Sequence, residues 1–147
     1  MEVIVEDSIV IRGIQKEDAT AIQGIRTEIL PGGEDVDFQT LVDAHVAGGT
    51  SFVAEYNGEV VGYIIGTILY AGFGVRKSAW ITSIGILPLS MGQGIGIKLV
   101  SRICEAFKEK GINAIHSSVM WDSFDALSFF RKLGFNRSEF INLKMDL

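Results

Sequence analysis

Cysteine is nearly absent from this chain, and so are long apolar runs. The single cysteine, Cys104, excludes an internal disulfide and a cysteine-based metal cluster. No apolar run reaches the ~20 residues needed to span a bilayer, and the longest, near residues 60–75, is interrupted by glycines. Residues 1–7 are acidic and lack the basic region of a signal peptide. We therefore expect a cytoplasmic protein with no membrane partner and no metal.

Positive charge is also scarce. Eighteen acidic residues outnumber thirteen basic residues, which gives a net charge of −5. This balance argues against a general nucleic-acid-binding surface, so no nucleic-acid partner is expected. Repeats, low-complexity tracts and linkers are missing, and the length favours one domain covering residues 1–147. On its expected helix, Cys104 is more typical of a buried small side chain than of a catalytic thiol.

Hydrophobic periodicity and turn residues predict a mixed α/β fold. Strands are expected at residues 8–14, 51–56, 59–70, 79–87, 113–120 and 135–147. Helices are expected at about residues 16–30, 38–46, 94–110 and 124–133. An antiparallel region thus precedes a βαβ region. This order predicts a mixed, mostly antiparallel twisted sheet of about six to seven strands flanked by about four helices.

The most informative stretch is the loop between the 79–87 strand and the 94–110 helix. After Pro88, glycine occupies alternate positions at Gly92, Gly94 and Gly96. Glycine lets the backbone approach a ligand closely because it has no Cβ atom. The first turn of the following helix offers unpaired N–H groups and the positive end of the helix dipole. Together these features predict a phosphate site, and hence a phosphorylated cofactor.

Two common glycine-rich patterns do not fit this loop. A Walker A loop needs Lys and then Ser or Thr after its last glycine, whereas Ile97 follows Gly96. A Rossmann fingerprint needs its third glycine at position 97 or 99, where the chain has Ile97 and Leu99. The antiparallel strands upstream of the loop also disagree with both patterns.

Two sequence blocks instead point to a known family. In the first, a strand and Pro88 precede Met91, which is followed by Gly92-Gln93-Gly94-Ile95-Gly96. The second comprises Ala126, Phe129 and the run Phe130-Arg131-Lys132-Leu133-Gly134-Phe135. The first resembles the Arg/Gln-x-x-Gly-x-Gly/Ala motif of the GNAT acyltransferase superfamily. The second resembles that family's Asn-x-x-Ala…Tyr-Glu-Lys-Leu-Gly-Phe segment. Both blocks occur in the family's order, and the resemblance covers about residues 8–147.

The resemblance implies acetyl-CoA (coenzyme A) as co-substrate and an amine as acceptor. In the family, the cofactor enters where two parallel strands separate, here the 79–87 and 113–120 strands. Backbone groups of the first strand would bind the pantetheine arm, and N–H groups of the glycine loop would bind the pyrophosphate. The cofactor-binding residues implied in this way are Ile84, Gly85, Ile86, Met91, Gly92, Gln93, Gly94, Ile95, Gly96, Ile97, Ser123 and Phe130.

Several positions depart from the family's pattern. Met91 replaces an Arg or Gln, Ser123 replaces an Asn that often contacts the cofactor, and Phe130 replaces a Tyr that commonly protonates the leaving thiolate. A phenyl ring cannot donate a proton. The general base is not identified either. The candidates are His116, since an imidazole can act as a base near neutral pH, and Ser118, at the position of a family Glu. A structural role is the more common one for such a histidine.

The sequence therefore supports two functions. The first is an N-acetyltransferase in which a primary amine attacks the thioester directly. The alternative, motivated by Phe130 and the missing base, is a non-catalytic acyl-CoA-binding or regulatory module. In such folds residues 16–50 largely set the acceptor, and Glu34, Asp35 and Asp37 favour a cationic small-molecule or peptide amine. The apolar final strand would expose an edge to another chain, which makes a homodimer a further expectation.

Overall fold

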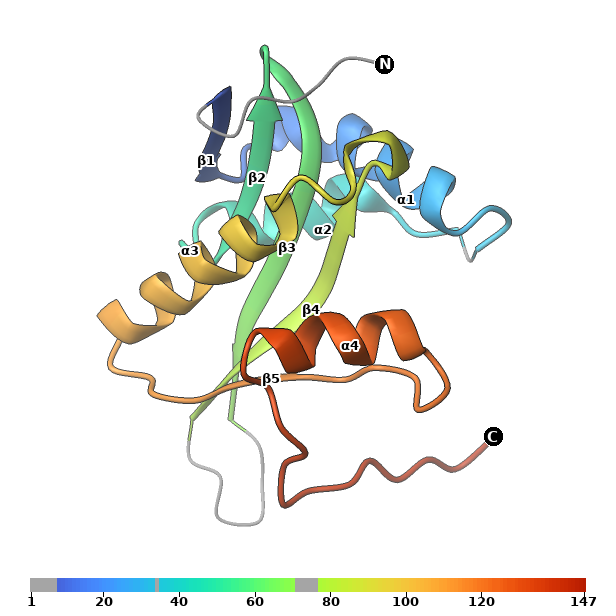
Figure 1. The fold of residues 1–147 in the computed structure, drawn as a ribbon, viewed down its shortest axis with the longest axis vertical. Coiled ribbons are helices and arrows are strands. Elements are labelled where there is room, and N and C mark those ends of the chain that lie inside the picture. Colours follow the sequence, from blue (N-terminus) through green and yellow to red (C-terminus); the bar gives the residue numbers. More distant parts are fainter. Residues whose placement is uncertain (1–7, 34, 71–76) are drawn as a thin grey trace. The chain divides into compact units, whose positions relative to one another are not determined.

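The computed structural model describes residues 8–33, 35–70 and 77–147 (Figure 1). They form two compact units, Met1–Ser117 and Ser118–Leu147. The first unit holds the sheet and helices α1–α3, and the second holds α4. In chain order, the elements are β1 (Ile9–Gly13), η2 (Lys16–Asp18), α1 (Ala19–Ile29), α2 (Phe38–Val46), β2 (Ser51–Tyr56), β3 (Glu59–Leu69), β4 (Ser78–Ile86), η3 (Pro88–Ser90), α3 (Ile95–Glu109), β5 (Ile115–Ser117) and α4 (Phe124–Lys132).

The sheet has five strands in the order β1-β2-β3-β4-β5. Three neighbouring pairs are antiparallel, and only β4 and β5 are parallel. Asn57 and Gly58 form the tight turn between β2 and β3 with positive φ angles of 51° and 78°, as the Asn-Gly pair predicts. The predicted mixed and mostly antiparallel sheet is thus confirmed.

Helix α3 lies close to two glycines of β3. A Cβ atom on Gly62 would lie 3.2 Å from Ile95 Cγ2 and 3.3 Å from Leu99 Cδ1. A Cβ atom on Gly66 would overlap Ile103 Cδ1 and lie 2.6 Å from the carbonyl oxygen of Thr50. These two glycines therefore allow the helix to approach the sheet. The side chains that α3 buries include the predicted apolar face, namely Ile95, Leu99, Val100, Ile103 and Phe107.

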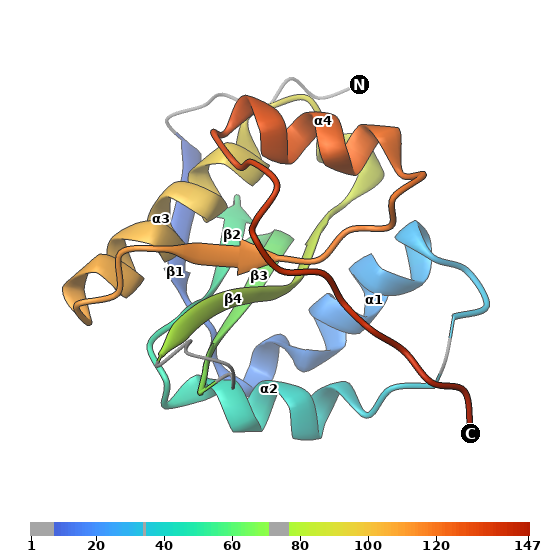
Figure 2. The same cartoon turned by 90° about the horizontal axis from the view of Figure 1, so that it is seen from below.

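The other face of the sheet is covered by α1 and α2 (Figure 2). Along β3, Tyr63 and Ile65 alternate with Gly62, Ile64 and Gly66, so their side chains point away from α3. They belong to a separate buried cluster that also contains Ile22 and Ile25 of α1 and Phe38 and Val42 of α2. The sheet is thereby packed between helices on both faces.

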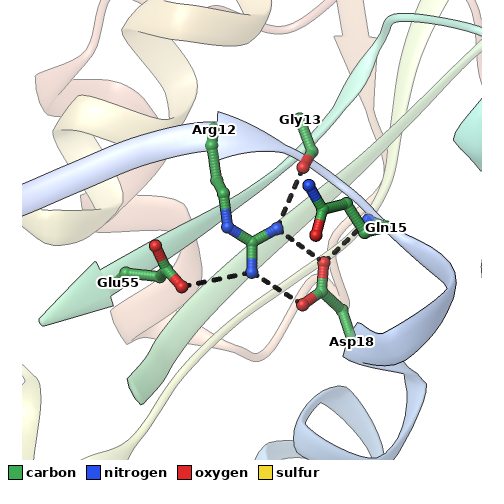
Figure 3. Close-up of polar contacts among 5 residues, drawn as sticks. All are labelled: Arg12, Gly13, Gln15, Asp18 and Glu55. Carbon is green, nitrogen blue, oxygen red and sulfur yellow. Dashed lines mark hydrogen bonds and ion pairs between the residues drawn. The ribbon is translucent and has the colours of Figure 1, made fainter. Parts of the chain in front are cut away.

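A partly buried ion pair fixes β1 to the start of α1 (Figure 3). The Arg12 guanidinium donates to both oxygens of Asp18, at 2.9 and 2.8 Å, and to Glu55 at 3.3 Å. Asp18 also accepts a 2.7 Å hydrogen bond from the backbone N–H of Gln15. The hydrogen bonds to Asp18 raise the pKa of Arg12 above its ordinary value. This bidentate arrangement joins β1, η2 and β2 at one point.

The strand count differs from the six to seven that the sequence predicts. The expected 113–120 strand is formed only at β5, and the expected 135–147 strand is not formed. Residues 141–147 alternate apolar and polar side chains, but Ile141 and Leu143 are 72% and 88% exposed. An alternating pattern yields a strand only when a neighbouring edge pairs with it.

Within the described residues, no helix has the length and apolar character needed to cross a membrane.

We predict that Gly66→Ala destabilises the protein by about 1–3 kcal/mol because the added methyl group meets the Thr50 backbone and two side chains of α3. Gly24→Ala in α1 is the matched control, since its Cβ would meet nothing within 4 Å and alanine favours a helix by about 0.5–1 kcal/mol. Urea unfolding measures both changes. Equal stability of the two variants would contradict the close packing of α3 on β3.

Candidate functional site

Strand β4 separates from β5 halfway along its length. The parallel pairing joins Ala79 to Ile115 and ends with Ile81 opposite Ser117. The next residue, Thr82, is an extra residue opposite the step from Ile65 to Gly66 of β3, so β4 carries a β-bulge there. Bulges bend a strand and increase its twist. Beyond the bulge, β4 continues to Ile86 with no strand on its β5 side among the described residues, which leaves an edge of peptide groups for a ligand.

The glycine loop connects this strand end to α3. Leu87 still donates its N–H to the Val61 carbonyl at 2.9 Å, and η3 follows. Gly92 and Gly94 then have φ angles of +80° and +78°, which glycine adopts without strain. A Cβ atom at either glycine would meet nothing within 4 Å. The two glycines thus allow the loop to turn, and the space next to their Cα atoms is open.

The N-terminus of α3 presents free hydrogen-bond donors. Gly94 is the N-cap residue and has no side chain with which to cap the helix. The first helical bond runs from the Lys98 N–H to the Gly94 carbonyl at 3.1 Å. The amides of Ile95, Gly96 and Ile97 precede that bond, so the helix itself does not use them. Combined with the helix dipole, these amides favour an anion such as a phosphate.

The end of β4 and the start of α3 lie close together in the first unit. The Cβ position of Gly62 is 3.2 Å from Ile95 Cγ2 and 3.4 Å from the Gly85 carbonyl oxygen. The structure therefore places Gly85 and Ile95, one from each of the two predicted segments, close together. Met91 is 52% exposed in the loop. The combined surface suits an elongated molecule with a phosphate group at one end.

A hydroxyl pair beside the β4 edge was not predicted from the sequence. Tyr63 OH lies 2.9 Å from Ser83 Oγ, and Tyr63 is 1% exposed. A Cβ atom on Gly85 would lie 2.6 Å from the Tyr63 ring, so glycine is required there. Only the cross-strand pairing of Tyr63 with Gly85 reveals this contact. The sequence offers no sign of it until the register of β3 and β4 is known.

The two candidates for the general base have different contacts, each within its own unit. His116 stacks on Trp80 with ring centroids 5.0 Å apart, and its Nδ1 lies 3.4 Å from the Ala79 carbonyl oxygen. These contacts give His116 a packing role between β4 and β5. Ser118 belongs to the second unit, where its hydroxyl accepts a 3.1 Å hydrogen bond from Asn142.

The second unit also contains the two remaining predicted cofactor residues. Ser123 is the N-cap of α4, without a capping hydrogen bond from its side chain. Phe130 is 8% exposed and packs edge-on against Phe129 and Phe135, with ring centroids 5.2 and 5.0 Å away. In this unit Phe130 therefore belongs to an aromatic cluster.

The acidic residues proposed to attract a cationic acceptor have different roles. Asp37 caps α2 and accepts hydrogen bonds from the Thr40 hydroxyl and N–H at 2.7 and 3.1 Å, which lower the pKa of Asp37. Asp35 lines a cavity in the first unit. Glu34 lies outside the described residues. In the described part of the chain, no group of three or more His, Cys, Asp or Glu side chains is placed to hold a metal ion.

Comparison with known proteins connects this geometry to a family. The acetyltransferase (GNAT) family matches residues 19–135. An uncharacterized N-acetyltransferase of Methanocaldococcus jannaschii is 30% identical over 91 residues, which are 61% of this chain and 40% of that protein. An acetyltransferase of Pectobacterium atrosepticum is 34% identical over 92 residues, which are 62% of this chain and 60% of that protein. The match thus spans less than two thirds of either relative.

Solved structures share the fold. The aminoglycoside N-acetyltransferase AAC(6')-Iy in complex with CoA superimposes with a TM-score of 0.81 at 18% identity, over 94% of each chain. Arabidopsis thaliana Naa50, in complex with a bisubstrate analogue, gives a TM-score of 0.73 at 22% identity, over 93% of this chain and 92% of that chain. A transcriptional regulator from Bacillus halodurans gives a TM-score of 0.79 at 24% identity, over 95% of this chain and 99% of that chain. At these identities, the likeness establishes the fold alone.

Proposed function

The chain belongs to the GNAT family of acetyltransferases, and on that premise we propose that it transfers the acetyl group of acetyl-CoA to a primary amine. One observation carries the proposal. The glycine-rich N-terminus of α3 lies beside the end of β4 that β5 leaves unpaired. The first feature suits a pyrophosphate, and the second offers peptide groups to an extended chain that carries amides of its own.

The fit to acetyl-CoA follows from these two surfaces. The amides of Ile95, Gly96 and Ile97 would hold the pyrophosphate, and backbone groups of residues 84–86 would hold the pantetheine arm. Because the binding groups belong to the backbone, Met91 in place of a basic side chain leaves them intact. The described CoA complex of AAC(6')-Iy and the bisubstrate complex of Naa50 support this co-substrate by analogy of fold.

The chemistry is a direct transfer without a covalent enzyme intermediate. The amine lone pair attacks the thioester carbon, a C–N bond forms and the C–S bond breaks. The nitrogen loses a proton and the thiolate gains one, so the products are an amide and free CoA. Peptide N–H groups at the separated strands would polarise the carbonyl, and positioning would supply most of the rate. His116 and Ser118 remain the candidates for the base, with water as the other proton carrier.

A non-catalytic acyl-CoA-binding module is the second candidate. The phenyl ring of Phe130, at the position of the family's proton donor, favours it. The regulator from Bacillus halodurans, which has the same fold, is described as a transcriptional regulator and supports such a role by analogy. This candidate keeps the cofactor site and lacks the transfer step, so cofactor binding and turnover must be tested separately.

We expect Gly94→Trp to weaken CoA binding by about tenfold or more, because the indole would occupy the open space where the phosphate binds. Gly111→Trp at the other end of α3 is the matched control. Both glycines have a φ of +78°, and in both the Cβ would meet nothing within 4 Å. Titration calorimetry with CoA measures the two affinities. A folded Gly94→Trp variant with unchanged affinity would exclude this loop as the phosphate site.

We expect Phe130→Tyr to raise the turnover of acetyl-CoA with an amine, because it restores a phenolic proton donor, and general acids contribute about 10²–10⁴-fold. Phe129→Tyr is the control, since it adds the same hydroxyl to the neighbouring ring. Thiol release measures turnover, and calorimetry checks that CoA affinity is unchanged. If neither substitution raises turnover, the lack of a phenolic proton donor on α4 does not limit catalysis.

A further inference from the structure

The first unit contains a cavity of about 200 Å³ between α1 and the segment that leads from α1 to α2. Its lining includes the apolar side chains of Leu30 and Phe38 and the polar side chains of Gln23, Arg26, Thr27 and Asp35. The mechanism proposed above uses none of these side chains. The cavity is therefore a separate feature whose chemistry needs its own explanation.

Arg26 is the distinctive residue of this cavity. Its side chain is half-buried, and its guanidinium makes no hydrogen bond or ion pair with the described residues. Of the other partly buried arginines among the described residues, Arg12 binds Asp18 and Glu55. Arg102 lies 4.5 Å from the centre of the Phe52 ring and 3.9 Å from Glu105, and its Nη1 makes no hydrogen bond. A guanidinium has five N–H donors arranged as a fork that matches the oxygens of a carboxylate or phosphate. Arg26 thus offers an unused site for an oxyanion.

Asp35 lines the same cavity, yet it does not pair with Arg26. Both charges are therefore available to a ligand that carries both signs. Asp35 is exposed and Arg26 is half-buried, so the arginine contact is the less hydrated of the two. Asp37 does not compete for Arg26, because its carboxylate caps α2. The cavity is complementary to a molecule with a positive amine and a negative oxygen group.

The position of the cavity connects it to the site on β4. Leu30 donates its N–H to the Arg26 carbonyl at 2.9 Å, so both residues lie in the last turn of α1. Ile29, from the same turn, lies next to β4, because its Cδ1 is 3.2 Å from the Cβ position of Gly85. Gly85 is a residue on which the pantetheine arm is proposed to lie. The last turn of α1 therefore contacts the cavity through Arg26 and Leu30 and contacts β4 through Ile29.

We infer that the acceptor is an amine that also carries a carboxylate or phosphate group, and that Arg26 binds this oxyanion. The inference rests on the proposed acetyl transfer and adds a substrate class to it. The amine would be directed toward β4, with the oxyanion held at Arg26. An uncharged or purely cationic amine lacks the group that Arg26 recognises, so it would react with a higher KM.

The test compares acceptors that differ only in the oxyanion. Acetyl transfer to glycyl-glycine is compared with transfer to glycyl-glycinamide, and transfer to phosphoethanolamine with transfer to ethanolamine. In one of the two pairs, we expect the acceptor with the oxyanion to have a kcat/KM about tenfold or more higher. The acceptor without the oxyanion cannot accept the charged hydrogen bond from Arg26. The pair that shows the difference identifies carboxylate or phosphate as the recognised group.

Variants then assign the preference to Arg26. In Arg26→Gln the preference should fall to about one, mainly through KM, whereas Arg26→Lys should keep part of it because the positive charge remains. Lys110→Gln, at the far end of α3, removes the same charge elsewhere and should keep the full preference. No preference in the wild-type protein, or a preference that survives in Arg26→Gln, would overturn the inference. If the wild-type protein does not bind CoA, the proposed function is instead overturned.

Discussion

The close contact of α3 with β3 is the constraint on which the rest of the site depends. Gly62 and Gly66 have no side chains, so Ile95, Leu99 and Ile103 settle directly on the sheet. This contact determines where α3 begins. Its first residue lies beside the Gly85 carbonyl, at the end of β4. The distance between the helix dipole and the strand edge is therefore set by packing, without any polar side chain.

The bulge at Thr82 supplies the second requirement, an edge that a ligand can reach. It follows the last pair between β4 and β5, so the strands separate where the polar backbone is needed. Unpaired peptide groups inside a protein are unfavourable unless a ligand or water satisfies them. The site consists mainly of such groups and of helix amides. Under the proposed function, Met91 in place of a basic residue would leave these binding groups intact, whereas Phe130 would leave the proton transfer to another group.

Local signals in the sequence predicted much of the fold. The bounds of α2 and β2 agree with the prediction, because each segment is short and is ended by glycine or Asn-Gly. The loop glycines and the apolar face of α3 also needed only local spacing. The Arg12–Asp18–Glu55 network, the bulge at Thr82 and the Tyr63–Ser83 contact depend on strand register, which one sequence does not reveal. The expected strand at residues 135–147 is not formed, because an alternating pattern indicates a tendency to pair and does not supply a partner strand.

The proposed function requires that backbone groups of β4 and α3 bind acetyl-CoA. It is tested most directly by recording amide NMR spectra of the protein during titration with acetyl-CoA. We expect the largest shifts at the amides of residues 84–86 and 92–97, with the amides of α2 unchanged. Saturable shifts confined to other parts of the chain, or no shifts at millimolar acetyl-CoA, would contradict it.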